Sequence, residues 1–168
     1  MKVSATEEFG VRCLVRLAEA WMQDRVATIP EVAAREDISP QYAAKLIGLA
    51  RQAGLVASIR GVNGGVRLAQ APETITLQDA FAALTGDALR TGRCEDPDHS
   101  NCVRAPDCGL RRVFGALHHV VLELLSGVTL ADMVRMEGDR SWRPEVVAGV
   151  LRRAGASTDS NPTGSVAG

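Results

Sequence analysis

A run of helix-like segments followed by two strand-like segments around a glycine-rich turn most constrains the fold of this 168-residue chain. Apolar residues recur at helical spacing from about residue 5 to residue 23, among them Phe9, Cys13, Leu17 and Trp21. This spacing predicts an amphipathic first helix with one buried face. Cys13 lies on that face and is expected to be a packed core residue rather than a reactive thiol.

Two further helices are expected before the strand-like segments. Pro30 begins the short segment PEVAARE, and proline is well suited to the first turn of a helix. Ser39 and Pro40 form a helix-starting pair, because serine caps the free N–H groups and proline follows at the first helical position. The third helix is predicted to run to about Ala53 and to end at Gly54, a residue type favoured just past a helix end.

The strand-like segments LVASIR and VRL flank the turn GVNGG, which predicts a β-hairpin. Helix, helix, turn, helix and hairpin is the order of a winged helix-turn-helix domain. The predicted fold class is therefore mainly α with a small β-hairpin wing, with a long dimerisation helix in the second half. The competing interpretation is a small domain of helices and strands with a solvated basic face and no nucleic-acid partner.

Charge is unevenly distributed although the net charge is only −1. Residues 38–70 have four cationic side chains and no acidic residue, whereas residues 71–139 have eleven acidic residues and six arginines. An acid-free basic segment is typical of a surface that binds a polyanion such as double-stranded DNA. Its cationic residues are Lys45, Arg51, Arg60 and Arg67.

In a winged helix the third helix enters the major groove, and the hairpin lies along the backbone or the minor groove. Side-chain amides and guanidinium groups can read base edges, while lysine holds phosphate. Tyr42 either contacts phosphate or anchors the third helix to the core. The candidate DNA-binding residues are Ser39, Gln41, Tyr42, Lys45 and Arg60.

The second half of the chain contains two more expected helices. Thr76 is expected to cap a helix over residues 77–84, and an apolar stripe at steps of three and four residues covers Leu110 to Leu125. Such a stripe is typical of a helix that packs against another helix. The segment from about Ala154 is rich in Ser, Thr, Asn, Pro and Gly, which indicates disorder. The expected divisions are a DNA-binding domain (1–86), a cysteine loop (87–109), a dimerisation helix with its following segment (110–138) and a largely disordered extension (139–168).

Three of the four cysteines, Cys94, Cys102 and Cys108, lie within fifteen residues in the pattern C-x7-C-x5-C. The polar, proline-containing window around them predicts a loop. The chain shows neither a signal-peptide pattern nor an apolar stretch of transmembrane length, so we expect a cytoplasmic protein with reduced thiols. Clustered cysteines in that setting favour metal or redox chemistry over disulfides.

Several chemistries fit this cysteine cluster. His99 could complete a zinc site with the three cysteines, although the spacing differs from that of common zinc knuckles. Iron–sulfur clusters accept longer and less regular spacing, and a metal-free set of redox-sensing thiols is a third alternative. A cysteine-dependent enzyme is disfavoured, because His99 is the one candidate base in the loop and no oxyanion-binding motif follows it.

Taken together, these motifs resemble the bacterial iron–sulfur winged-helix transcriptional repressor family typified by IscR, NsrR and RirA. The resemblance covers roughly residues 1–135. It rests on the three cysteines and on the stretches MKVSATEEFGVRCLVRLA, DISPQYAAKLIGLARQAGLVASIRGVNGG and VTLADMV. It implies a homodimeric regulator that crosses its long helices, binds a palindromic operator, and senses iron, redox state or nitric oxide.

The resemblance also implies a set of cluster ligands. Isc-type members use a histidine three positions after the third cysteine, where this chain has Arg111. Nitric-oxide-sensing members use an acidic residue near the N-terminus of the partner subunit, and Glu8 occupies that position here. The implied ligands are Cys94, Cys102 and Cys108 with Glu8 from the partner subunit. Three cysteines and one carboxylate favour a 4Fe–4S cluster, with a 2Fe–2S cluster as the alternative. Ala44 replaces a glutamate that helps Isc-type members discriminate operators, so a different operator sequence is expected.

Overall fold

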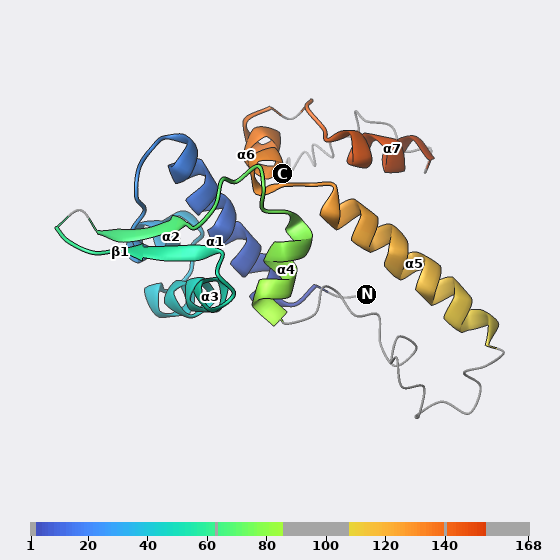
Figure 1. Ribbon diagram of the computed structural model, residues 1–168, viewed down its shortest axis with the longest axis horizontal. Helices are drawn as coiled ribbons and strands as arrows, with labels where there is room; N and C mark the ends of the chain where they lie inside the picture. Colours follow the sequence, from blue (N-terminus) through green and yellow to red (C-terminus); the bar gives the residue numbers. More distant parts are fainter. Residues whose placement is uncertain (1–2, 63, 86–107, 140, 154–168) are drawn as a thin grey trace, which may run out of the picture.

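The computed structural model describes residues 3–62, 64–85, 108–139 and 141–153. Helices dominate this part of the chain, and one antiparallel hairpin projects from it (Figure 1). The predicted fold class, mainly α with a small hairpin wing, is therefore confirmed. In chain order the elements are α1 (Ala5–Met22), α2 (Ile29–Arg35), α3 (Pro40–Gln52), β1 (Val56–Ile59), β2 (Gly65–Leu68), α4 (Leu77–Thr85), α5 (Gly109–Ser126), α6 (Leu130–Gly138) and α7 (Glu145–Arg153).

Side-chain caps fix where the N-terminal helices begin. The Ser4 hydroxyl accepts a hydrogen bond from the Glu7 backbone N–H, and the Glu7 carboxylate accepts one from the Ser4 N–H. Thr28 and Glu31 form the same reciprocal capping box at α2. This cap starts α2 at Ile29, one residue before the expected Pro30, so the proline still lies in the first turn.

The hairpin pairs β1 with β2 in antiparallel register, from Val56 opposite Leu68 to Ile59 opposite Gly65. Ala27, in the segment before α2, forms an isolated antiparallel bridge with Val66 of β2. A side chain at Gly65 would collide with the Ala27 carbonyl oxygen, so glycine is required for this close approach. The wing is thereby fastened to the body of the domain at its base.

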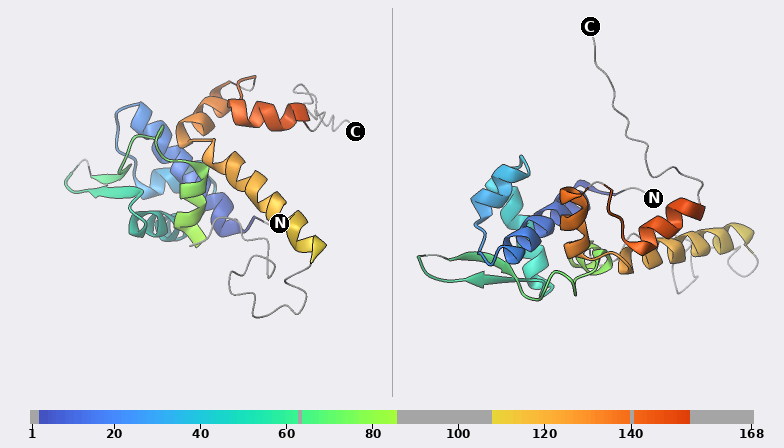
Figure 2. Two further views of the ribbon diagram at one scale, coloured as in Figure 1. Left: turned by 45° about the vertical axis from the view of Figure 1, so that its right-hand side comes forward. Right: turned by 90° about the horizontal axis from the view of Figure 1, so that it is seen from above.

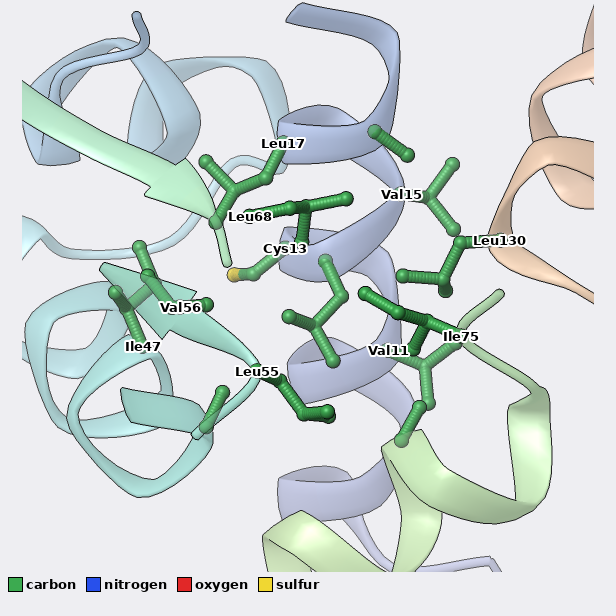
Figure 3. Packing of buried hydrophobic residues seen from close by; sticks show 14 of the residues in the cluster. Val11, Cys13, Val15, Leu17, Ile47, Leu55, Val56, Leu68, Ile75 and Leu130 are labelled. Carbon is green, nitrogen blue, oxygen red and sulfur yellow. The ribbon is translucent and has the colours of Figure 1, made fainter. Parts of the chain in front are cut away.

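Helix α1 is the centre of the hydrophobic core and contacts α2, α3, α4, α6 and β2. Figure 3 shows Cys13 and Leu17 of α1 packing beside Leu68 of the hairpin. Leu17 is completely buried, and Cys13 is 1% exposed. The expected core role of Cys13 is therefore confirmed. Aromatic residues make up only 4% of the chain, so aliphatic side chains fill most of this core.

Helix α5 extends away from this core, on the side opposite the hairpin (Figure 2). Its bounds, Gly109–Ser126, match the helix predicted from the apolar stripe. Leu125, near its C-terminal end, is its one buried residue. Four apolar residues along the rest of the helix are between 43% and 64% exposed: Leu110, Val113, Leu117 and Val120.

The chain returns to the core after α5. Thr129 caps α6 and pairs with Thr76, and Leu130 of α6 is completely buried. Residues 145–153 then form α7, which contacts α5. The extension expected to be largely disordered therefore contains a helix in its first half, while residues 154–168 lie outside the described residues.

Candidate DNA-binding surface and cluster ligands

Helix α3 presents two of the predicted DNA contacts on one exposed face. Gln41 and Lys45 are exposed and lie one helical turn apart, so their side chains are neighbours on the helix surface. The opposite face of α3 packs into the core through Ala43, Leu46, Ile47 and Ala50. The core thus fixes which face of α3 is available to a groove of DNA.

Ser39 and Tyr42 have structural duties at the start of the same helix. The Ser39 hydroxyl accepts a hydrogen bond from the Tyr42 backbone N–H at 3.2 Å, as the predicted cap requires. The half-buried Tyr42 ring meets the edge of Phe9 in α1, with 6.1 Å between ring centroids. This packing favours the anchoring interpretation of Tyr42, because it holds the N-terminal end of α3 against α1.

The wing carries a cation and an apolar residue near its tip. Arg60 is exposed directly after β1, and the neighbouring Val62 is fully exposed at 105% of its reference area. Gly61 has a φ of 112°, which allows the chain to turn between them. Sequence analysis did not select Val62, although an apolar residue inside a glycine-rich turn could have signalled it.

The four cations of residues 38–70 do not have equivalent surroundings. Arg67 stacks over the Trp21 ring, with its guanidinium carbon 4.1 Å from the ring centroid, and lies 3.6 Å from an Asp24 carboxylate oxygen. Its charge is therefore partly compensated within the fold. Arg51, at the C-terminal end of α3, instead donates a hydrogen bond across to the hydroxyl of Ser58 in β1.

Of the three loop cysteines, the structure describes Cys108. Its thiol is free and half-buried, and the residue occupies the N-cap position of α5 without forming a side-chain cap hydrogen bond. The thiolate is the form of cysteine that binds a metal. Cys94, Cys102 and His99 lie outside the described residues.

The proposed fourth ligand, Glu8, is exposed in the first turns of α1. Its carboxylate lies 3.5 Å from the Arg12 guanidinium, one turn further along the helix. Arg12 also donates a 2.6 Å hydrogen bond from Nε to Glu36, the C-cap residue of α2. These ion pairs raise the pKa of Arg12 above its usual value, chiefly through the bond to Glu36. Glu8 is thus accessible and only loosely paired.

Glu36 is the centre of an ion-pair network that sequence analysis missed. Its side chain is 5% exposed, and a second arginine, Arg16, approaches it to 2.9 Å. Arg16 also pairs with Glu19 of α1 and with Glu137 of α6. A buried carboxylate needs such partners to offset its desolvation. The network therefore ties α1 to α2 and α6, and it lies directly before the turn that leads into α3.

The described donors fit an iron-containing group in their chemistry. Thiolate and carboxylate groups such as those of Cys108 and Glu8 are ligands that iron accepts. Within residues 3–62, 64–85, 108–139 and 141–153, no three His, Cys, Asp or Glu side chains gather closely enough to hold a metal ion. A complete ligand set from this chain would therefore have to draw on Cys94 and Cys102 as well.

Comparison with known proteins identifies the architecture. Residues 3–136 match the model of the Rrf2 family, described as iron-dependent transcriptional regulators. The HTH-type transcriptional regulator NsrR of Bacillus subtilis is 32% identical over 139 residues, which cover 83% of this chain and 94% of NsrR.

Two solved structures have the same fold. IscR of T. potens superposes with a TM-score of 0.67 at 27% identity, over 85% of this chain and 92% of that one. CymR, the global cysteine regulator of B. subtilis, gives a TM-score of 0.66 at 27% identity, over 80% and 97% of the two chains.

None of the described helices is both long and apolar enough to cross a membrane. These relatives are regulators of transcription, which confirms the prediction of a regulator rather than an enzyme. Because the family model spans most of the sequence and the fold agrees with that of solved family members, the chain belongs to the Rrf2 family of winged helix-turn-helix transcriptional regulators.

Proposed function

We propose that this chain is an iron–sulfur-dependent transcriptional repressor that acts in the cytoplasm as a homodimer on a palindromic operator. One observation carries the proposal: Cys108, the last of three clustered cysteines, is a free thiol at the N-terminus of the long helix α5 in a member of the Rrf2 family. The ligand set is Cys94, Cys102 and Cys108 with Glu8 of the partner subunit. The bound group would supply a reactivity toward iron supply, redox state or nitric oxide that amino-acid side chains lack.

The exposed apolar stripe of α5 supports the homodimer. Residues at steps of three, four and three along one helix face form a seam suited to a second helix, and this seam is uncovered in the single chain. Pairing of two α5 helices would bring two DNA-binding domains into one particle. Two recognition helices would then read two half-sites related by the same twofold symmetry.

The contacts of Glu8 suggest how ligand state reaches the DNA-binding surface. Arg12 is shared between Glu8 and Glu36, and Glu36 ends α2 directly before the turn into α3. When Glu8 binds the cluster of the other subunit, Arg12 loses its weaker ion pair and keeps only its pair with Glu36. The position of α3 relative to α1 would then depend on whether Glu8 is free, which is a shift between two populated states.

On the DNA side, α3 would enter the major groove and the hairpin would lie toward the adjacent minor groove. Gln41 and Arg60 are the candidate base contacts, and Lys45 is a candidate phosphate contact. Ser39 and Tyr42 complete the proposed set at the N-terminal end of α3. Replacement of Arg60 by alanine should weaken operator binding and leave the visible absorption spectrum unchanged.

The test is anaerobic purification followed by absorption spectroscopy and analysis of iron, sulfide and zinc. About four iron and four sulfide per chain would support a 4Fe–4S group, and about two of each a 2Fe–2S group. Cys108→Ala should abolish the absorption, whereas Cys13→Ala, which alters a cysteine of the core, should retain it. One zinc per chain with no sulfide would contradict the proposal and leave a zinc-stabilised DNA-binding protein without a sensing role.

A further inference from the structure

A groove runs between the recognition helix α3 and the wing. Its volume is about 440 Å³. Ala44, Gly48 and Arg51 of α3 line it, together with Ser58 and Gly64 of the wing. The start of α2 also contributes, through Thr28, Ile29 and Pro30. The α3 residues lie three and four positions apart, so they form one row that continues from Gln41 along the helix. The groove therefore adjoins the proposed DNA-reading face and lies outside the set of contacts assigned above.

The charge of the groove suits an anion. Arg51 and Ser58 both line it, and the Arg51 guanidinium donates a hydrogen bond to the Ser58 hydroxyl at 3.2 Å. None of the described lining residues is acidic. A guanidinium has five N–H donors, so the bond to Ser58 orients the group and leaves donors free for a ligand. This fixed orientation distinguishes Arg51 from Arg67, which is stacked over Trp21.

The shape of the groove suits a chain that passes through it. The α3 residues that line it include the small residues Ala44 and Gly48 beside Ile47, and a Cβ placed at Gly48 would meet no atom within 4 Å. On the wing side, a side chain at Gly64 would collide with the backbone oxygen of Ile59. The glycine at position 64 is therefore required by the hairpin's own backbone, whereas the small residues on α3 leave the space in front of that helix open.

A sugar–phosphate strand of duplex DNA is an anionic chain that could occupy this groove. The major and minor grooves are separated by one sugar–phosphate strand, so a domain that places α3 in one groove and its wing toward the other must straddle that strand. We propose that this strand lies in the groove between α3 and the wing, and that Arg51, held by Ser58, binds its phosphate. The inference rests on the proposed DNA binding and does not depend on the cluster.

Arginine suits this role better than lysine would. Its planar fork can donate two parallel hydrogen bonds to one phosphate, and the contact fixes where the duplex sits without reading its sequence. The loss of Arg51 should therefore weaken binding to all duplexes by a similar factor. It should also lower the dependence of affinity on salt, because one fewer counterion is released.

The probe is a mixed-sequence, fluorescently labelled duplex of about 30 base pairs, roughly three helical turns. Its binding to the 168-residue protein is measured by anisotropy over a range of salt concentrations. Arg51→Ala should weaken binding about tenfold and reduce the slope of log affinity against log salt by about one. Arg51→Lys should recover most of the slope and part of the affinity, since it restores the charge without the fork.

Two further variants separate this role from general electrostatics and from misfolding. Arg152→Ala removes an equal charge from exposed α7 and should leave affinity and slope near wild type. Gly48→Leu fills the groove from a helix position with open space, so it should preserve the melting temperature and weaken DNA binding. Equal losses for Arg51→Ala and Arg152→Ala, or a Gly48→Leu variant that binds like wild type, would overturn the groove assignment alone. A wild-type protein that binds no duplex, with or without its cluster, would overturn this inference together with the proposed function.

Discussion

Helices α1 and α5 both have a row of aliphatic residues, but the row on α1 is buried and most of the row on α5 is exposed. Leu17 of α1 is completely buried by elements of the same chain, whereas Leu117 of α5 is 43% exposed. The apolar spacing along both segments is helical, and both form helices as predicted. Periodicity alone therefore identifies an amphipathic helix, but whether its apolar face is covered depends on which neighbours the fold provides.

The largest effect is expected in the α1 core. Leu17→Ala should lower the free energy of unfolding by about 3 kcal/mol, because it removes a fully enclosed side chain and leaves a cavity. Chemical denaturation followed by circular dichroism measures this change. A loss below about 1 kcal/mol would show that neighbouring side chains can fill the space left by Leu17. The α1 core and the exposed part of α5 would then differ less in packing than their burial indicates.

A substitution in the exposed stripe of α5 should affect self-association of the protein rather than the stability of its fold. Leu117→Asp places a charge in the exposed stripe and should raise the dissociation constant of the proposed dimer about 100-fold, equivalent to about 2.7 kcal/mol. Sedimentation velocity over a dilution series measures it, and Glu123→Ala on the same helix is the control. A Leu117→Asp protein that remains as dimeric as wild type would exclude the α5 stripe as the dimer seam.

A dependence of stability on pH should arise from the buried cysteine, Cys13. Burial raises the pKa of Cys13 from 9.0 to about 11, so its thiol stays protonated in the folded state at pH values where the unfolded chain would ionise. This contribution is complete below about pH 9 and is lost as pH rises through 11, a decrease on the order of 2–3 kcal/mol. Denaturation between pH 8 and pH 11 should give a smaller decrease for Cys13→Ala than for wild type, whereas equal decreases would remove Cys13 as the cause.

The smallest stability effect is expected at Glu8. Its ion pair with Arg12 spans 3.5 Å between side chains that are about half exposed, so Glu8→Ala should change unfolding free energy by less than about 0.5 kcal/mol. The same substitution should make the proposed cluster easier to lose, measured as the decay of its visible absorption in air. Unchanged cluster decay together with unchanged DNA affinity would remove Glu8 as a ligand.

Much of the fold could be predicted because its signals are local. Ser39 followed by Pro40 marks the start of α3, and Gly54, with a φ of 81°, follows its end. Other features were not local enough to predict. The two arginines that converge on Glu36 come from α1, twenty or more residues away in sequence. The helix α7 was missed because the composition of the tail that follows it dominated the interpretation of residues 139–168.

The candidate sites show the same division. The family resemblance, the cysteine spacing and the candidate DNA-binding residues were readable from the sequence, because each depends on residue types at short separations. The packing of Tyr42 on Phe9, the stacking of Arg67 on Trp21 and the hydrogen bond from Arg51 to Ser58 became visible in the folded chain. Those contacts depend on how α1, α3 and the hairpin pack together. The residues next to a cation in the sequence do not indicate which distant side chain it will contact in the fold.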